Sequence, residues 1–229
     1  MVNKAIILAA GESYDTQDIF PKILLKNPIT NKTILDNFLD HYGDNSLFVL
    51  GFRSLSVLNA YPNINVVLNH SWSTTKSAHS LALAVECLPP NEIVDIYSGD
   101  YFIENNFFKE FQSNECDNLI VASYREERST KACNLVIRDQ KILSKYYGKI
   151  RDTKHPESLG IIRTSVYNIK NWIFSLSRNY RSLYATDIIP DEFLENFQIF
   201  IDDDYQIHEI NNSNDFIKYR SLRNDKNQY

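Results

Sequence analysis

The segment from Lys4 to Leu25 reads KAIILAAGESYDTQDIFPKILL, and it decides the fold of the chain. An apolar run leads into two alanines and a glycine, a polar loop follows, and a Pro-Lys pair precedes a second apolar run. This order predicts a buried first strand, a turn of small residues at its carboxyl end, and a lysine beyond the loop. Backbone N–H groups in such a turn can bind phosphate oxygens, and a lysine can neutralise them.

Apolar runs alternate with amphipathic patterns through the first half of the chain. Residues 46–51, 64–69 and 92–98 read as strands, whereas residues 33–42 and 77–88 place their apolar side chains on one helical face. Strands that alternate with helices predict an α/β fold, here a single-domain, Rossmann-like three-layer α/β/α sandwich with a mixed, mainly parallel sheet. Ligands of such sheets bind at the carboxyl ends of the strands, where the strand order reverses.

The second half has a looser pattern but continues the same domain. Strands are expected within residues 118–123, 133–137, 141–147 and 158–164, and the segment 141–147 can pair with 133–137. A helix is expected within residues 187–197, and because proline interrupts a helix, it should begin at or after Pro190. Residues 197–211 predict one or two strands, and residues 213–225 predict a capped C-terminal helix. Without a linker or repeat, residues 1–229 are expected to form one domain.

Composition excludes several classes of protein. The net charge of −5 argues against general nucleic-acid binding, which depends on Lys and Arg. The N-terminal apolar run is too short for a secretory signal, and none is long enough for a membrane span, so a soluble cytoplasmic protein is expected. Three widely spaced cysteines, Cys87, Cys116 and Cys133, predict buried thiols rather than disulfides or a zinc site.

Three elements can carry chemistry at the expected sheet edge. Gly11 follows the first strand, Lys22 is anchored by Pro21, and Asp100 follows the fourth strand after Ser98 and Gly99. Each has a plain structural alternative, respectively a tight turn, a solvated lysine and an Asx turn. Together they suggest a phosphate site, because Lys22 can stabilise a transferring phosphoryl group and Asp100 can bind Mg²⁺.

The segments AIILAAG…PK, YSGD and IHEINNSNDFIKY, in this order, resemble the nucleotidyltransferases of the nucleotide-diphospho-sugar transferase fold. Within that group, NHSWSTTKSAHSLALAVECL is similar to the corresponding region of cytidylyltransferases that act on phosphocholine and related phospho-alcohols. The resemblance covers nearly the whole chain. It implies transfer of a nucleoside monophosphate, most often CMP, from CTP to a phosphorylated small molecule, with Mg²⁺ as cofactor and pyrophosphate as product. Such enzymes serve surface glycan or capsule biosynthesis. They are often dimers, so a homodimer is one state that the resemblance allows, and the sequence leaves the oligomeric state open.

The resemblance also implies roles for individual residues. Residues 1–115 would form the part that binds the nucleoside triphosphate, residues 116–200 the acceptor part, and residues 201–225 the strand and helix of the metal site. Asp100 and Asn211 would hold the metal, with Lys22 and Asp100 as catalytic residues. Nucleotide contacts would come from Leu8, Ala9, Ala10, Gly11, Glu12, Ser13, Lys22, Thr75, Ser77, Ser80, Ser98 and Gly99.

The resemblance implies an acceptor side, and the residue types there suggest candidates for it. Lys145, Lys149 and Arg151 are cations that could hold the phosphate of the acceptor. Tyr101 and Tyr184 could face a quaternary ammonium group by cation–π attraction. Packing in the core or on the surface is the structural alternative for each of these side chains.

The first loop departs from the pattern of the family. Ser13 stands where a second glycine is usual, and Asp15 stands where an arginine is usual. Three interpretations remain: the loop takes another route, a cation such as Arg53 or Lys76 substitutes, or the chain is a degenerate enzyme that only binds nucleotide.

An alternative function for the whole chain is that of a glycosyltransferase of similar architecture, which needs a metal-binding DxD. Asp202 to Asp204 is the candidate for that motif, and a solvated turn is the structural alternative for these three acids.

Overall fold

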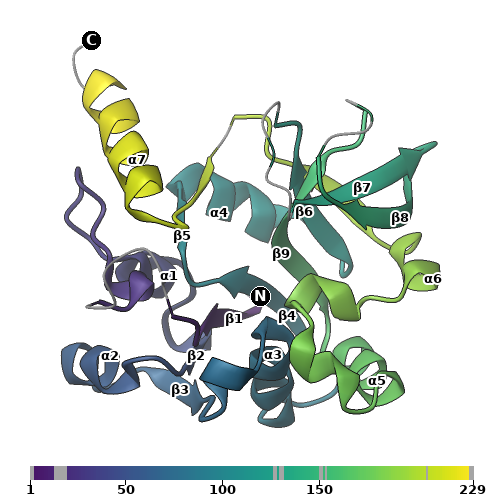
Figure 1. The fold of residues 1–229 in the computed structure, drawn as a ribbon, viewed down its shortest axis with the longest axis horizontal. Helices are drawn as coiled ribbons and strands as arrows, with labels where there is room; N and C mark the ends of the chain where they lie inside the picture. Colours follow the sequence, from purple (N-terminus) through teal and green to yellow (C-terminus); the bar gives the residue numbers. More distant parts are fainter. Residues whose placement is uncertain are drawn as a thin grey trace.

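The central sheet of the computed structural model has the strand order β3-β2-β1-β4-β9-β6-β10 (Figure 1). The structure describes residues 3–12, 20–125, 128, 132–149, 152, 154–204 and 206–226, with side chains up to residue 221. The strands of this path are β1 (Lys4–Ala9), β2 (Ser46–Leu50), β3 (Asn65–Leu68), β4 (Ile93–Ser98), β6 (Leu119–Ser123), β9 (Glu157–Ser165) and β10 (Gln198–Ile201). Only β9 runs antiparallel to its neighbours on this path, so the sheet is mixed and mainly parallel, as predicted.

The reversal of strand order locates the ligand-binding edge. β1 pairs in parallel with β2 on one side and with β4 on the other. The chain first runs outward through β2 and β3 and then returns to β4, so the switch point lies between β1 and β4. The carboxyl ends of these two strands, Ala9 and Ser98, therefore lie where sheets of this topology usually bind ligands.

Helices cover both faces of the sheet, which gives three layers (Figure 1). On β1, Ala5 and Ile7 belong to one buried cluster and Ile6 to the other, as expected for alternating side chains. The first cluster includes residues of α1 (Ile34–Tyr42), α2 (Ser54–Ala60), α4 (Asn105–Ser113) and α7 (Ser213–Lys226). The second includes residues of α3 (Ser77–Glu86), α5 (Val166–Ser175) and α6 (Asp191–Leu194).

Two further strand pairs extend this core. β7 (Cys133–Arg138) and β8 (Lys141–Tyr147) form the predicted antiparallel pair, and β5 (Tyr101–Ile103) pairs with β11 (Ile207–Glu209). The second pair brings the segment after Asp100 next to the C-terminal region. Short 3₁₀ helices are η1 (Lys22–Leu24), η2 (Gly43–Asn45), η3 (Trp72–Thr74), η4 (Asn179–Ser182) and η5 (Ala185–Ile188).

The predicted elements agree with the structure in most places. Residues 197–211 form two strands, and α6 starts directly after Pro190 but spans a single turn. The helices α2, α4 and α5 were not predicted. Cys87 is exposed rather than buried, whereas Cys133 is buried as expected.

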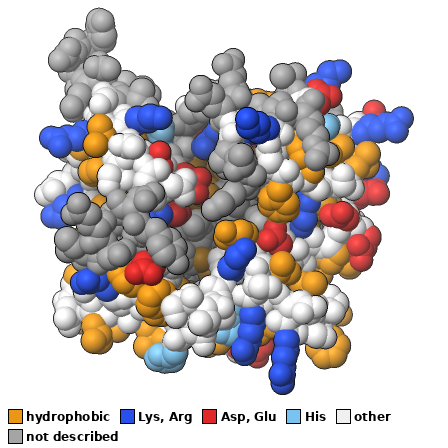
Figure 2. All heavy atoms as spheres, in the orientation of Figure 1, with side chains coloured by type: hydrophobic (Ala, Val, Ile, Leu, Met, Phe, Trp, Pro, Cys, Tyr) orange, Lys and Arg blue, Asp and Glu red, His pale blue; other side chains and the backbone are white. Residues whose placement is uncertain are grey.

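The charged side chains on the surface are of both signs. Lys and Arg side chains are interspersed with Asp and Glu on the face shown in Figure 2, without one broad basic surface. Among the described residues, no helix combines the length and apolar character that a membrane span requires.

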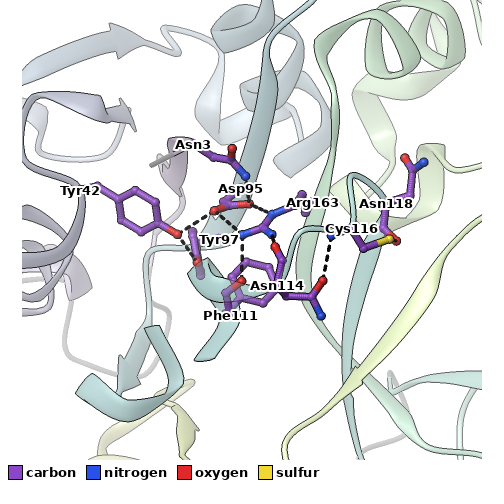
Figure 3. A network of polar contacts seen from close by, with 9 residues as sticks. All are labelled: Asn3, Tyr42, Asp95, Tyr97, Phe111, Asn114, Cys116, Asn118 and Arg163. Atoms are coloured by element: carbon purple, nitrogen blue, oxygen red, sulfur yellow. Dashed lines mark hydrogen bonds and ion pairs between the residues drawn. The ribbon is translucent and has the colours of Figure 1, made fainter. Parts of the chain in front are cut away.

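An ion pair lies inside the sheet, between Asp95 of β4 and Arg163 of β9 (Figure 3). The guanidinium donates to both carboxylate oxygens, at 2.6 and 3.1 Å, and to the backbone carbonyl oxygen of Phe111 at 3.0 Å. Tyr42 donates to Asp95 at 2.9 Å, and its hydroxyl lies 2.6 Å from that of Tyr97. The network connects α1, α4 and the two strands through buried polar groups that all have partners.

Candidate active site

Lys22 and Asp100 meet at the predicted edge of the sheet. Lys22 opens η1, behind the extended backbone of Pro21, and its Nζ lies 3.3 Å from Oδ2 of Asp100. The hydroxyl of Ser98 donates to Oδ1 of Asp100 at 2.6 Å. About a fifth of each side chain in the ion pair, 17% for the lysine and 20% for the aspartate, is exposed to solvent. Two residues that are far apart in the sequence thus form one partly open polar site.

Close packing of small residues shapes this edge. A Cβ on Gly99 would lie 2.6 Å from the Cβ of Ala9, so only glycine fits there. A Cβ on Gly51, just after β2, would lie 2.7 Å from the carbonyl oxygen of Ala10. By contrast, a Cβ on Gly11 would meet no atom within 4 Å among the described residues. Gly11 is exposed, and its lack of a side chain is therefore not explained by packing.

Some of the predicted nucleotide contacts lie along this edge, and others lie outside the described residues. Leu8 and Ala9 end β1, and the carbonyl oxygen of Leu8 accepts a hydrogen bond from the N–H of Gly99 at 2.9 Å. Ala10 is buried and Glu12 is partly buried. Ser13 and Asp15 are not among the described residues, so the departure of the first loop from the family pattern stays a sequence observation.

The predicted hydroxyl cluster supports the segment before and within α3. Asn69 donates to the hydroxyls of Thr75 at 3.2 Å and Ser80 at 3.0 Å. Thr75 in turn donates to the carbonyl oxygen of Ser71 at 2.8 Å, and Ser77 accepts from the N–H of Ala185. These hydroxyls already have protein partners and fix the backbone. Their contact with a nucleotide remains a prediction.

Glu209 is a site residue that the sequence analysis did not single out. It ends β11, opposite Tyr101 in β5, and its side chain bonds to that of Asn211. Glu209 is open to solvent on one side, but the protein around the rest of it, and then the charge of Asp100, raise its pKa to about 7. The sequence signal for Glu209 is its place two residues before Asn211, in the segment Glu-Ile-Asn.

These side chains fit a hard divalent cation. Asp100, Glu209 and Asn211 offer carboxylate and amide oxygens, and Mg²⁺ takes one or two protein carboxylates beside water and phosphate oxygens. Within the described part of the chain, no group of three or more His, Cys, Asp or Glu side chains is arranged to hold a metal alone. The donor set therefore suits a cation that arrives with a phosphate ligand rather than a closed structural metal site.

Among the predicted acceptor residues, Tyr101 and Lys145 are held by the protein. Tyr101 is buried and donates to the carbonyl oxygen of Leu159 at 2.5 Å. Lys145 donates to the carbonyl oxygens of Thr186 at 2.9 Å and Ile189 at 2.8 Å, and burial lowers its pKa. Both side chains contribute to the packing of this region, and a direct contact with an acceptor stays a prediction.

The other predicted cations lie in more open positions. Lys149 is exposed, and Arg151 falls outside the described residues. Tyr184 is 46% exposed, and the ammonium group of Lys76 lies 4.3 Å from the centre of its ring. That ring thus already has a cation against it. Arg53 lies over the ring of Phe52 at 5.5 Å, after the carboxyl end of β2.

A second charged group, Arg125 and Glu157, was also missed by the sequence analysis. Arg125 donates to the carbonyl oxygen of Ile207 at 3.0 Å and interacts electrostatically with Glu157 and Glu209. Burial raises the pKa of Glu157, and the charge of Arg125 opposes that shift. Arg125 follows the end of β6 and Glu157 opens β9, and no local motif joins them in the sequence.

The three consecutive acids do not form a metal-binding DxD. Asp202 is buried and accepts hydrogen bonds from the N–H groups of Gln206 at 2.8 Å and Ile207 at 3.4 Å. Asp203 and Asp204 are exposed. The expectation of a solvated turn was therefore wrong for Asp202, whose carboxylate fixes the turn between β10 and β11.

Comparison with known proteins gives a clear result for the fold. No protein-family model and no curated protein matches the sequence. CTP:phosphocholine cytidylyltransferase from Streptococcus pneumoniae matches with a TM-score of 0.77 and 18% identity, over 97% of this chain and 99% of the other. Inositol-1-phosphate CTP transferase from T. maritima gives 0.71 and 17%, over 97% and 95%.

A nucleoside-diphosphate-sugar pyrophosphorylase from Vibrio cholerae also matches, with a TM-score of 0.69 and 10% identity, over 93% of this chain and 98% of the other. The match thus extends over nearly the whole length of each chain. The α/β architecture predicted from the sequence is confirmed, and this chain has the fold of nucleotidyltransferases.

Proposed function

We propose that this protein is a Mg²⁺-dependent nucleotidyltransferase that transfers a nucleoside monophosphate, CMP in the first instance, to a phosphorylated small molecule. A phosphate oxygen of the acceptor forms a bond to the α-phosphorus of the triphosphate. The bond between the α-phosphorus and the bridging oxygen breaks, and pyrophosphate leaves with that oxygen. No general base is required, because the phosphate of the acceptor is already ionised.

The observation that carries this proposal is the meeting of Lys22 and Asp100 at the switch point between β1 and β4. A cation and a carboxylate at this place match the two needs of phosphoryl chemistry, charge neutralisation and cation binding. The likeness of the fold to a CTP:phosphocholine cytidylyltransferase and an inositol-1-phosphate CTP transferase supports the choice of CTP as donor.

Each part of the site then has a role. Ala9, Ala10 and Gly11 would bring the phosphates to the end of β1, where Gly11 is exposed, and Lys22 would neutralise charge on the transferring group. Asp100, Glu209 and Asn211 would hold Mg²⁺, which supplies charge stabilisation to the phosphates when bound. Ser98 orients Asp100, because its hydroxyl donates to one of the two carboxylate oxygens.

The charges beside the site favour an acceptor that carries a positive group. Glu157 lies close enough to Arg125 and to Glu209 to interact electrostatically with both. With Glu209 given to the metal, the carboxylate of Glu157 can attract an ammonium or trimethylammonium group, and Arg125 can donate to the phosphate of the same molecule. Phosphocholine-like phospho-alcohols carry both a positive group and a phosphate, and the product would enter surface glycan biosynthesis. Sugar phosphates carry the phosphate but no positive group.

The test is a two-step assay on the purified protein. The thermal midpoint is first measured with Mg²⁺ and each of CTP, UTP, GTP and ATP, since binding to the native state raises it by mass action. Pyrophosphate release is then measured with the stabilising nucleotide and phosphocholine, phosphoethanolamine, inositol 1-phosphate or glucose 1-phosphate. Stabilisation by CTP and release with a phospho-alcohol is the expected result.

Other outcomes would point elsewhere. Stabilisation by a nucleotide-sugar and by no triphosphate favours a glycosyltransferase, although the turn Ser98-Gly99-Asp100 supplies one acid where a DxD needs two. Stabilisation by a triphosphate without pyrophosphate release from any acceptor favours a degenerate nucleotide-binding protein. In the latter case the acidic Asp15 in the first loop is the first residue to replace, by arginine.

A further inference from the structure

Both carboxylate oxygens of Asp100 have a partner within the protein. Oδ1 accepts from the hydroxyl of Ser98 at 2.6 Å, and Oδ2 faces the ammonium group of Lys22 at 3.3 Å. The Ser98 contact can persist when a cation binds, because each carboxylate oxygen has two lone pairs. The ammonium group is different, since it puts a positive charge where a divalent cation would have to approach Oδ2.

We propose that Lys22 is the resident counter-ion of Asp100 and must leave it before a divalent cation can bind. The exchange rests on the proposed function: the phosphates of an incoming triphosphate draw the ammonium group away from Asp100. Oδ2 then becomes free for the cation that the triphosphate brings. The triphosphate and the divalent cation therefore bind with positive coupling that the protein itself supplies, in addition to their chelation of each other.

The position of the two residues supports an exchange rather than a permanent ion pair. Lys22 lies on η1, which is preceded by a long polar segment, and Asp100 lies in the turn between β4 and β5. At 3.3 Å the pair is longer than a tight charge-assisted hydrogen bond. By contrast, the wholly buried pair of Asp95 and Arg163 has two hydrogen bonds and is enclosed on all sides. A partly exposed contact through one atom of each partner costs less to break.

The coupling has a reciprocal consequence. If Lys22 competes with the divalent cation for Asp100, then Asp100 competes to the same extent with a metal-free triphosphate for the ammonium group of Lys22. Removal of the Lys22 charge should therefore improve binding of the cation alone. Neutralisation of Asp100 should improve binding of the triphosphate alone. Both are gains of affinity, which a misfolded variant or the simple loss of a ligand does not produce.

The experiment measures Mn²⁺ binding without nucleotide, from the free Mn²⁺ signal in electron paramagnetic resonance, for the wild type, Lys22→Met and Lys22→Arg. Lys22→Met is expected to bind Mn²⁺ about tenfold more tightly than the wild type, because an opposite charge at this range shifts ion affinity of a carboxylate by roughly that factor or more. Lys22→Arg keeps the charge and is expected to remain near the wild type. Mn²⁺ binding to Lys22→Met that is no tighter than to the wild type overturns the proposal.

The reciprocal measurement uses Asp100→Asn in the presence of EDTA, with whichever of the four nucleotides stabilises the wild type. This variant is expected to bind the metal-free triphosphate more tightly than the wild type does, and equal or weaker binding contradicts the exchange. The two proposals fail separately. If no nucleotide stabilises the wild type, the proposed function falls, whereas the comparison of Mn²⁺ affinities still decides whether Lys22 competes with the cation.

Discussion

Arg163 lies directly opposite Asp95 across the antiparallel pair of β9 and β4, and the two side chains are joined by two hydrogen bonds of 2.6 and 3.1 Å. Both are enclosed, with 2% and 0% of their surface exposed. β9 is the strand that runs antiparallel between β4 and β6, so this pair joins the parallel strands β3, β2, β1 and β4 to the second half of the sheet. An ion pair at this seam specifies which residues of β4 and β9 face each other, because any register slip would leave a buried charge without its partner.

Replacement of Arg163 by Met is expected to lower the free energy of unfolding by about 3–5 kcal/mol, since it leaves the Asp95 carboxylate buried without its counter-ion. Urea denaturation followed by circular dichroism measures the loss. The double variant Asp95→Leu/Arg163→Met should recover a large part of it, because no charge is then buried. A loss of less than about 1 kcal/mol in the single variant would show that water reaches the site.

Asp36 gives the fold a dependence on acidic pH. It is the third residue of α1 and forms a capping box with Thr33, whose N–H donates to it at 2.8 Å. Burial alone would raise its pKa, but hydrogen bonds from the backbone N–H of Thr33 and the hydroxyl of Tyr61 outweigh burial, so the pKa lies below the ordinary 3.8. Its stabilising contribution is therefore complete only well above the ordinary pKa of 3.8, and it is lost as the pH falls through the lowered pKa.

Replacement of Asp36 by Ala is expected to cost about 1 kcal/mol at pH 7, typical of a lost cap. The difference between the variant and the wild type should shrink as the pH is lowered from 4 toward 2, because the wild type then loses the same charge. Urea unfolding at several pH values checks this. A difference that stays constant down to pH 2 would mean that the carboxylate charge does not contribute.

Local chemistry explains which parts of the fold could be predicted. The first strand, the capped helix that begins after Thr33 and the turn at Asp100 each have a signal within about ten residues. The helix α4 does carry an apolar stripe, Phe107, Phe108 and Phe111, and was overlooked. The helices α2 and α5 lack so clear a signal, because Leu55, Tyr167 and Phe174 are apolar side chains on their exposed faces and blur the amphipathic pattern. Their helical state is decided by packing on the sheet.

A residue of the candidate site could be predicted from the sequence only where it follows a strand of the expected parallel sheet. Lys22 and Asp100 could be paired because parallel strands end at one edge. Glu209 and Arg125 could not, since they reach the site through the pairing of β11 with β5 and a hydrogen bond to Ile207, contacts between distant parts of the chain. Asp202 was misjudged because three consecutive acids look solvated, whereas the turn they form has N–H groups that need an acceptor.

Gly99 and Gly11 form a matched pair for testing the shape of the proposed nucleotide site. A Cβ on Gly99 would overlap the Cβ of Ala9 at 2.6 Å, whereas a Cβ on Gly11 would meet none of the described residues within 4 Å. Gly99→Ala is therefore expected to lower the free energy of unfolding by about 1–3 kcal/mol, as overpacking does. Gly11→Ala should change it by less than about 0.5 kcal/mol, as for most surface substitutions.

Gly11→Ala nevertheless should weaken binding of the stabilising nucleotide, since it adds a side chain where the phosphates are expected to approach the backbone. Thermal unfolding with and without nucleotide separates the two effects. Unchanged nucleotide stabilisation in Gly11→Ala would remove this glycine from the binding site and leave only the neighbouring residues Ala9 and Ala10.

Lys22→Ala should strongly reduce the rate of pyrophosphate release while it changes the free energy of unfolding little. If its ammonium group stabilises the transferring phosphoryl group, kcat/KM should fall by about 10²–10³-fold, the usual cost of one preorganised electrostatic contact. The surface pair of Lys32 and Asp40, 2.5 Å apart and exposed, supplies the control. Lys32→Ala removes the same type of side chain from the same type of ion pair, so it should leave turnover unchanged. Equal losses in the two variants would mean that Lys22 contributes general surface charge and that the phosphoryl group is stabilised elsewhere.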